Sequence, residues 1–314
     1  MKILFIAPLP PPLGGHSLAA KVFLDDLVTA HDVDVINLNR DSMEVGKVTF
    51  NRIFEVLNIV MQIWRKRRGI EAIYFTISES LTGNIKDLLI YLICFGSLSK
   101  MFIHLHGGSI KRCLFERYRC LMKINRVFVS RLGGVIVLGP SHVQIFRDMV
   151  DQSRIHVVPN FAQDYLFVTE EVIRAKFRNR DSLRIIFIGN MIKDKGYNEI
   201  VEAYFALSNS SRELVEIDFA GRFESHAEKD EFLNKIDGWD RIRYHGVVDG
   251  SEKKKLFSQA QIFCLPTSFL EGQPIAILEA YACGCVVLTT GQPGIKDIFS
   301  DGINGYEIKD RSAG

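Results

Sequence analysis

The chain has 314 residues, of which 47% are hydrophobic and 24% are charged. This composition is typical of a globular protein and excludes a disordered, collagen-like or low-complexity chain. The length predicts two domains, because one domain takes roughly 100–200 residues. The net charge of +2 is too balanced for a dedicated DNA-binding protein, which usually carries a strong basic excess.

The charge is nevertheless distributed unevenly along the chain. Residues 1–168 contain 20 Lys and Arg against 14 Asp and Glu, which gives a net charge of +6. Residues 169–314 contain 19 against 23, which gives −4. A basic first half and an acidic second half favour two domains with different surfaces.

The six cysteines are scattered through the chain rather than arranged as a disulfide framework, so we expect a reducing compartment. Cys283 and Cys285 are separated by one residue, but no second pair with metal-like spacing accompanies them. We interpret them as small buried residues rather than metal ligands.

Two apolar segments have to be distinguished from targeting or membrane segments. The apolar run that begins at Ile3 is short and ends in prolines, whereas a signal peptide needs about 7–15 apolar residues, so we interpret it as a buried strand. The run Leu88–Leu98 is interrupted by Gly96 and is too short for a membrane span, which takes about 18 apolar residues or more. We expect this second run to form a buried helix.

Short apolar runs alternate with helical patterns along the whole chain. Most of the runs are continuous, which is typical of strands that are buried on both faces of a parallel sheet. Together with the alternation, this predicts an α/β fold with doubly wound sheets. The expected strands are Ile3–Ala7, Val33–Leu38, Ala72–Thr76, Met101–Leu105, Gly134–Leu138, Ile155–Val158, Arg184–Ile188, Glu216–Ala220, Ile242–His245, Ile262–Leu265 and Val286–Thr289.

A polar segment without strand signal, residues 161–182, separates the two series of strands. We therefore predict two tandem Rossmann-like domains, residues 1–165 and 166–314. Ligands of such sheets bind beyond the carboxyl ends of the strands, so we expect the site in a cleft between the two domains. A doubly wound domain normally continues with more helices after Gly305, and we expect the C-terminal end to be truncated.

The most informative segment is residues 263–288. A strand is followed by a polar loop, Pro274 suits the first position of a helix, and Gly284 suits its end. The free backbone amides at the start of this helix form an anion site. Glu271 lies in the loop and Glu279 in the second helical turn. Because a carboxylate accepts hydroxyl hydrogen bonds, the pair suits a sugar and a ribose that flank a diphosphate.

Here the chain resembles a known family. Glu271 and Glu279 match the E-x7-E motif of the retaining, GT-B-fold glycosyltransferases of family 4, the glycosyl transferases group 1. Further segments resemble that family in the same order along essentially the whole chain: PLPPPLGGHS (8–17), IHLHGGS (103–109), VVPN (157–160), FIGNMIKDKGYNEIVEAY (187–204), YHGVV (244–248) and DGINGYEI (301–308).

The resemblance implies a set of site residues. Glu279 would hold the ribose hydroxyls, Glu271 would contact hydroxyls of the transferred sugar, and Lys195 would neutralise the diphosphate. The implied catalytic residues are His106, Glu271 and Lys195, and the implied donor-binding residues are Gly14, Gly15, Gly189, Asn190, Lys195, Gly272, Gln273, Pro274, Ile275 and Glu279.

Two positions leave alternatives open. Asn190 stands where the family usually has Arg, so it can donate a hydrogen bond to a phosphate but brings no charge. His106 precedes two glycines at a strand end, and the resemblance places it against the donor sugar. His104 is the alternative at that site, and a purely structural histidine is a further one.

The resemblance implies a front-face mechanism that retains the anomeric configuration. The departing phosphate takes the acceptor proton, so no protein base is needed, and Glu271 is not expected to be a covalent nucleophile. Asp32 and Asp34 match the DxD motif with which other glycosyltransferases bind a metal ion. Here they lie at the start of the second expected strand, and we interpret them as solvated residues at the entry of that strand. We expect no cofactor and no metal.

The segment Lys111–Arg131 contains seven basic residues and one acidic residue. Apolar residues interleave at helical spacing: Leu114, Tyr118, Leu121 and Met122. A second basic cluster is Arg65–Arg68. The segment is either a solvated helix face or an interfacial surface for anionic lipid, and we favour the second interpretation. No pattern of a nucleic-acid-binding module is present.

We therefore predict a retaining, hexosyltransferase-type enzyme that moves a sugar from a UDP- or GDP-sugar to a glycan or lipid-linked acceptor in surface polysaccharide or glycolipid synthesis. We expect it in the cytoplasm, peripheral at the inner face of the membrane. The alternatives are a non-catalytic nucleotide-sugar-binding partner subunit and a GT-B-fold epimerase or hydrolase. A dehydrogenase is disfavoured, because no GxGxxG follows the first expected strand.

Overall fold

The computed structural model describes residues 1–39, 50–178 and 182–311. By its internal contacts the chain divides into two compact units. The first unit is Met1–Pro159 with Glu271–Gln273, and the second is Asn160–Leu270 with Pro274–Gly314. The domain boundary expected between residues 165 and 166 stays a prediction.

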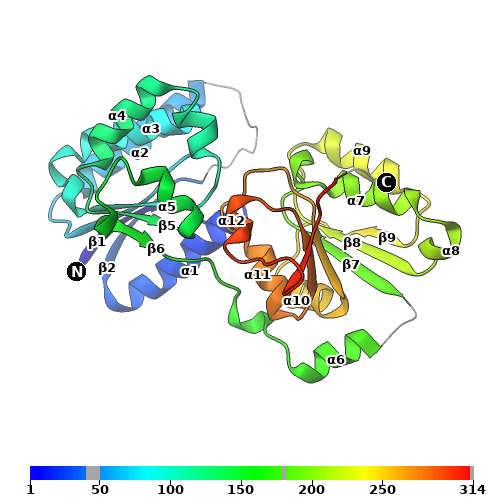
Figure 1. The fold of residues 1–314 in the computed structure, drawn as a ribbon. Helices are drawn as coiled ribbons and strands as arrows, with labels where there is room; N and C mark the ends of the chain where they lie inside the picture. The colour runs from blue at the N-terminus through cyan, green and yellow to red at the C-terminus, as the bar shows by residue number, and fades with distance from the viewer. Residues whose placement is uncertain (40–49, 179–181, 312–314) are drawn as a thin grey trace. The chain divides into compact units, whose positions relative to one another are not determined.

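The first unit is built on a six-stranded sheet of order β2-β1-β3-β4-β5-β6 in which every neighbouring pair is parallel (Figure 1). Its strands are β1 (Lys2–Ala7), β2 (Asp32–Asn37), β3 (Ala72–Thr76), β4 (Met101–Leu105), β5 (Gly134–Val137) and β6 (Ile155–Val157). Its helices are α1 (Gly15–Ala30), α2 (Phe50–Lys66), α3 (Leu81–Ile93), α4 (Arg119–Val129) and α5 (Pro140–Phe146).

The two faces of this sheet bury alternate residues of each strand. Leu4 and Ile6 of β1 belong to the larger core cluster, which also contains buried residues of α2 and α3. Phe5 and Ala7 belong to a smaller cluster with Ala20 of α1. Helices therefore cover both faces, which explains why β1 is a continuous apolar run.

The second unit repeats this plan with a parallel sheet of order β12-β11-β10-β7-β8-β9 (Figure 1). Its strands are β7 (Leu183–Ile188), β8 (Val215–Ala220), β9 (Ile242–Tyr244), β10 (Ile262–Leu265), β11 (Val286–Thr289) and β12 (Gly305–Glu307). Its helices are α6 (Glu170–Arg178), α7 (Tyr197–Ala206), α8 (Asn209–Arg212), α9 (His226–Ile236), α10 (Gly250–Gln259), α11 (Ile275–Ala282) and α12 (Pro293–Lys296).

The strands expected from the apolar runs are confirmed as β1 to β11, with ends that differ by no more than one residue. The strand β12 was not expected, because its three residues include the exposed Tyr306 and form no apolar run. Pro274 is not the first helical residue, because its ψ of 115° is extended and it caps α11 instead.

Two expectations for helices are corrected. The run Leu88–Leu98 does not form a helix buried all round, because Ile90 and Leu98 are buried whereas Leu89 and Leu92 are exposed. The segment Lys111–Arg131 forms a wide helical turn, Lys111–Phe115, followed by α4. Its interleaved apolar residues belong to the core of the first unit rather than to a lipid-facing surface: Leu114 is buried, and Tyr118, Leu121 and Met122 pack against that core.

At position 196 of the second unit, both the backbone conformation and the neighbouring atoms favour glycine. Gly196 has φ of +85°, and a Cβ on it would lie 2.4 Å from the Pro266 carbonyl oxygen. We expect Gly196→Ala to lower the free energy of unfolding by about 3 kcal/mol, because left-handed strain and a steric clash add together. Urea denaturation measures this change.

Gly238→Ala is the matched control. Gly238 has a similar φ of +77°, but a Cβ on it would have nothing within 4 Å. This variant should lose only about 1 kcal/mol, the cost of the backbone conformation alone. Equal losses in the two variants would show that the approach of Gly196 to Pro266 is unimportant.

Candidate functional site

In both units, the loops that carry the expected site residues follow the carboxyl ends of parallel strands. In the first unit, Gly14 and Gly15 follow β1, and His106 follows β4 directly. In the second unit, Gly189 and Asn190 follow β7. The segment from Glu271 to Ile275 comes after β10 in the sequence, and its first three residues count with the first unit. These sheet edges are where ligands of such folds bind.

At the edge of the first sheet, three histidines and a tyrosine form a cluster. The ring of His106 stacks between two others, with centroid distances of 3.9 Å to His104 and 4.3 Å to His16. The Tyr74 hydroxyl lies 2.7 Å from His104 Nδ1 and 3.4 Å from His106 Nε2. The two candidate histidines of the sequence are thus parts of one hydrogen-bonded group.

The surroundings of the cluster lower the pKa of all three histidines. Burial, with a contribution from the charge of Lys86, lowers the pKa of His16 to about 4. Burial and the neighbouring His16 lower the pKa of His104 to about 3. Burial and both neighbouring rings also lower the pKa of His106 well below its ordinary value. At neutral pH these rings are therefore neutral and can each donate one hydrogen bond and accept another.

The loop after His106 is held by a buried carboxylate that the sequence reasoning missed. Glu79 Oε1 accepts hydrogen bonds from the backbone N–H groups of Ser109 (2.6 Å) and Ile110 (2.9 Å). A Cβ at Gly107 would lie 1.6 Å from Glu79 Oε2, so only glycine fits there. Burial raises the pKa of Glu79, and the two N–H groups oppose that shift. Glu79 therefore fixes the backbone directly after His106.

The glycine loop after β1 is organised by Ser17. The Gly14 N–H donates to Ser17 Oγ at 3.0 Å, and Ser17 Oγ donates in turn to the Pro12 carbonyl at 2.8 Å. Gly14 has φ of −156°, and a Cβ on it would meet Ser17 Oγ at 3.9 Å. The packing of the protein itself therefore does not require glycine at position 14.

In the second unit, a carbonyl joins two of the expected donor-binding loops. The Asp194 carbonyl accepts hydrogen bonds from the backbone N–H groups of Ser268 (2.7 Å) and Phe269 (3.2 Å). The neighbouring Lys195 places its ammonium 5.6 Å from the centre of the Phe269 ring. The Lys195 turn and the loop after β10 thus lie side by side at one edge of the sheet.

Gly189 and Asn190 are positioned by a close contact with the next strand. Gly221 follows β8 with φ of +150°, and a Cβ on it would lie 1.7 Å from the Gly189 carbonyl oxygen. The backbone of Met191, next along the chain, pairs with Phe223. The loop that carries Asn190 is therefore fixed by its backbone.

Glu279 lies in an ion pair that sequence reasoning did not anticipate. The Lys253 Nζ atom is 3.0 Å from Glu279 Oε1, and both side chains are almost fully buried. Lys253 also lies 3.8 Å from Asp249, whose carboxylate accepts a hydrogen bond from the Tyr165 hydroxyl at 3.4 Å. Burial and these two carboxylates raise the pKa of Tyr165 to about 12. A hint was present in the sequence, because Lys253 shares helical spacing with the buried Leu256 and Phe257.

The remaining predicted residues lie between β10 and α11. Glu271, Gly272 and Gln273 form the loop, Pro274 precedes the helix, and Ile275 is its first residue. Glu279 lies further along the same helix. The chain therefore passes from the loop to the helix N-terminus and then to a buried carboxylate, which is the order that the sequence predicts.

The aspartates and cysteines that we did not interpret as metal ligands have structural surroundings that fit this interpretation. Asp34 lies in β2, 3.3 Å from Lys66 and 3.6 Å from Lys2. Cys283 and Cys285 are buried, as expected. Within residues 1–39, 50–178 and 182–311, no cluster of His, Cys, Asp or Glu has the arrangement of a metal site.

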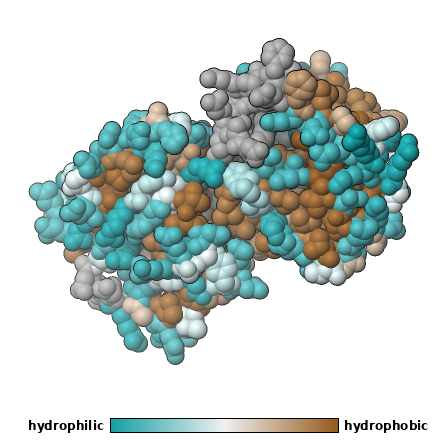
Figure 2. Space-filling model, turned by 180° about the vertical axis from the view of Figure 1, so that it is seen from behind, coloured by the Kyte–Doolittle hydropathy of each residue, from teal (hydrophilic) through white to brown (hydrophobic). Residues whose placement is uncertain are grey.

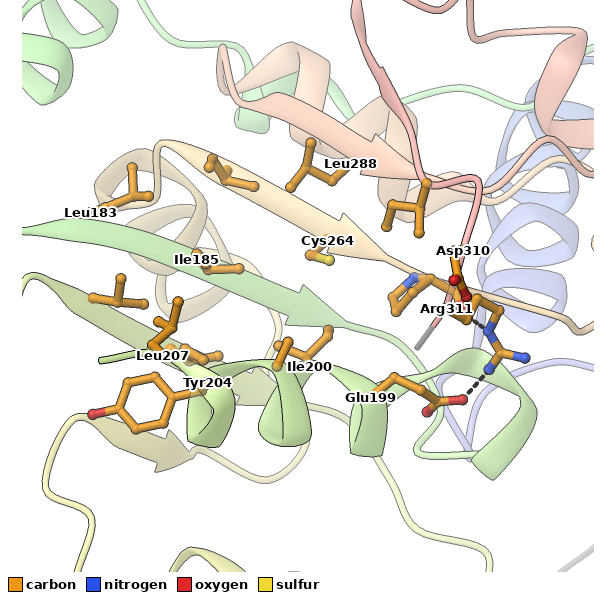
Figure 3. A pocket seen from close by; sticks show the side chains of 16 residues that line it. Leu183, Ile185, Glu199, Ile200, Tyr204, Leu207, Cys264, Leu288, Asp310 and Arg311 are labelled. Carbon is orange, nitrogen blue, oxygen red and sulfur yellow. Dashed lines mark hydrogen bonds and ion pairs between the residues drawn. The ribbon is translucent and has the colours of Figure 1, made fainter. Parts of the chain in front are cut away.

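A hollow of about 390 Å³ lies over the face of the second sheet, between α7 and the strands (Figure 3). Apolar side chains such as Ile185, Ile200 and Leu288 line it, and Arg311 pairs with Glu199 at one end (Figure 3). None of the predicted donor-binding residues lines it. Its apolar wall does not suit a charged diphosphate.

Comparison with known proteins identifies similar sequences and structures. Residues 168–314 match the family model for glycosyl transferases group 1. An uncharacterized glycosyltransferase of Methanocaldococcus jannaschii is 26% identical over 273 residues, or 80% of this chain and 67% of the relative. The O-antigen chain mannosyltransferase B of Escherichia coli is 28% identical over 122 residues, 37% of this chain and 30% of the relative. The chain thus spans about two thirds of the first relative and under a third of the second.

Among solved structures, the Anabaena protein HepE in complex with UDP-glucose superposes with a TM-score of 0.69 at 16% identity, over 100% of this chain and 86% of that chain. At this identity the similarity shows the fold. The chain has the GT-B fold, with two tandem α/β units.

The histidine cluster makes stability depend on pH. In the unfolded chain His16 and His104 become protonated below about pH 6.5. In the folded protein their buried rings stay neutral until the pH falls to about 4 for His16 and about 3 for His104. Because the unfolded state then binds more protons, the free energy of unfolding decreases as the pH falls through this range. We expect the melting temperature to fall by about 5 °C or more between pH 7 and pH 5. In His104→Gln/His106→Gln the fall should be roughly halved. Scanning calorimetry measures both.

The exposed His156 provides the control. His156→Gln should keep the full pH dependence. If His104→Gln/His106→Gln melts with the same pH dependence as the unmodified protein, the cluster is not neutral in the folded state.

Proposed function

We propose that this chain, whose residues 168–314 match the family model for glycosyl transferases group 1, transfers a sugar from a nucleotide-sugar donor to a glycan or lipid-linked acceptor. The observation that carries the proposal is the buried ion pair between Glu279 of α11 and Lys253 of α10. A buried carboxylate held by one lysine is a preorganised acceptor for sugar hydroxyls.

In this proposal Glu279 binds the ribose of the donor. Lys253 holds Oε1, so Oε2 accepts the ribose hydroxyl hydrogen bonds. Lys253 also offsets the desolvation of the carboxylate, since an unpaired charge buried at this depth would be strongly destabilising. Lys253 thus acts as a positioning residue for Glu279.

The diphosphate binds at the same sheet edge. Lys195 supplies a positive charge, and the backbone amides of Gly272 to Ile275 supply hydrogen-bond donors and the favourable end of a helix dipole. Asn190 adds a neutral donor. Gly14 and Gly189 have room for a Cβ within the protein, which supports a ligand rather than packing as the reason for glycine at these positions.

At the reacting carbon, His106 and Glu271 contact the transferred sugar. The bond from the anomeric carbon to the phosphate oxygen breaks, and the bond to the acceptor oxygen forms on the same face. The acceptor proton passes to the departing phosphate, so the sugar keeps its anomeric configuration without a protein base. The neutral His106 ring donates a hydrogen bond without competing for that proton.

Support for the donor and the setting comes from the relatives. HepE was solved with UDP-glucose, and the Escherichia coli relative is named for the O-antigen chain. We propose a UDP- or GDP-hexose as donor and surface polysaccharide or glycolipid synthesis as the setting. We place the enzyme in the cytoplasm, peripheral at the membrane.

Thermal stabilisation by UDP and by GDP, each with EDTA and with magnesium, tests donor binding. A nucleotide at about 100 times its Kd stabilises the folded state by about 2.7 kcal/mol, which raises the melting temperature by several degrees. We expect such a shift with one nucleotide in EDTA. Glu279→Gln should lose most of it, because the ribose contact is lost.

Glu252→Gln is the matched control, since Glu252 is an exposed carboxylate next to Lys253 on α10. It should leave the shift unchanged. Absence of a shift with either nucleotide, or an undiminished shift in Glu279→Gln, would contradict the proposed donor site.

The stereochemical course is testable separately. NMR of the product should show the anomeric configuration of the donor sugar, and the rate in EDTA should stay within about twofold of the rate with magnesium, because Lys195 and the amides provide the charge stabilisation. An inverted product or loss of transfer in EDTA would refute the front-face, metal-independent mechanism.

A further inference from the structure

Three helices of the first unit expose an unusual number of large apolar side chains. The large apolar residues of α2 that are exposed are spaced by three and four residues, so they lie on one helix face. The same holds for α3, and the chain continues from it to the exposed Phe95. We define the α2–α3 face as Phe54, Leu57, Met61, Trp64, Leu81, Ile85, Leu89, Leu92 and Phe95. Figure 2 shows apolar residues gathered over a broad part of the surface of the first unit.

The exposed side of α3 carries no charge at all. Its exposed residues are the four leucines and isoleucines of the α2–α3 face and Thr82. The charged residues of α3, Lys86 and Asp87, are buried and pair with each other at 3.0 Å. A helix that faced only water would place its charges outward, so this pattern is typical of a surface that contacts something apolar.

The helices of this surface are packed together. The backbones of α2 and α3 are in contact. Asn84 of α3 and Asn125 of α4 exchange two buried amide hydrogen bonds, of 3.1 and 2.9 Å. Ile124 and Val127 of α4 are exposed apolar residues as well. The three helices are thus joined by packing and by buried hydrogen bonds.

Basic residues border the apolar area. The Arg68 guanidinium lies 5.9 Å from the Trp64 ring, and that of Arg131 lies 5.6 Å from the Phe95 ring. Further exposed basic residues are Arg65 on α2 and Arg119, Lys123 and Arg126 on α4. The exposed acidic residues among the described parts of α2 and of Lys111–Arg131 are Glu55 and Glu116.

We propose that the α2–α3 face and the basic residues of α4 dock on an anionic lipid bilayer. Apolar side chains enter the boundary between headgroups and acyl chains, while arginines and lysines extend to the phosphates. A second copy of this chain is the weaker candidate, because a twofold interface would bring the same basic border against itself. Among the described residues no helix is both long and apolar enough to cross a bilayer.

Co-sedimentation with vesicles tests this proposal. We compare vesicles of phosphatidylcholine with vesicles in which about a quarter of the lipid is phosphatidylglycerol. The protein should bind the anionic vesicles, and Ile85→Glu/Leu89→Glu should bind them at least about tenfold more weakly. Arg119→Gln/Lys123→Gln should weaken binding several-fold and reduce its dependence on salt.

The matched control is Leu214→Glu/Val247→Glu, which changes two exposed apolar residues of the second unit and should bind like the unmodified protein. Phe54→Glu/Trp64→Glu is a second test variant, on α2. Thermal melting of each variant shows that it is folded, and the nucleotide-induced shift reports the donor site independently.

The outcomes separate the possibilities. Failure to bind anionic vesicles, or undiminished binding by both folded test variants, overturns the docking proposal. So does a dimer in light scattering that Ile85→Glu/Leu89→Glu dissociates, because the face would then bind a second copy. Vesicle binding requires no sugar transfer, so a missing nucleotide shift with intact vesicle binding contradicts the proposed function alone.

Discussion

Parallel pairing of the strands is the constraint from which the other features follow. In each unit the six strands of the sheet run in one direction, so all their carboxyl ends meet at one edge. Residues far apart in the sequence are thereby brought together, as with Tyr74 on β3 and His104 on β4 in the first unit. In the second unit the same constraint places the turn of Lys195 against the loop after β10.

Burial then decides which charges can exist at each edge. In the first unit no lysine or arginine forms part of the described histidine cluster, and the rings are held neutral by desolvation. In the second unit Glu279 is equally buried but has Lys253 as a partner. The described histidine cluster therefore offers neutral hydrogen-bonding groups, whereas the Glu279–Lys253 pair offers charged ones.

Much of the fold could be predicted, because strands buried on both faces are continuous apolar runs that stand out from amphipathic helices. The strand β12 was missed because it is short and carries the exposed Tyr306. The sequence predicted that Glu271 lies in the loop after β10 and that Glu279 lies in the helix that follows. Lys253 was not predicted, since it sits in a run of three lysines of which it alone is buried. The helical spacing with Leu256 and Phe257 indicates that Lys253 faces the core, but not that it meets Glu279.

The surface of the first unit shows a similar limit. The sequence indicated a basic segment, but the apolar residues within it pack inward against the core. The exposed apolar residues lie instead on α2 and α3, where an apolar run such as Leu88–Leu98 was expected to be buried. Hydrophobicity alone does not show whether both faces of a helix are covered; that depends on what the fold places against it.

We propose above that Glu279, held by Lys253, binds the ribose of a nucleotide sugar. A crystal structure of the protein with bound UDP would show this contact. We expect the ribose hydroxyl oxygens within about 3 Å of the Glu279 carboxylate and the diphosphate beside Lys195. A nucleotide bound in the hollow over β7 and β10, or one whose ribose lies away from Glu279, would refute the proposed role of Glu279.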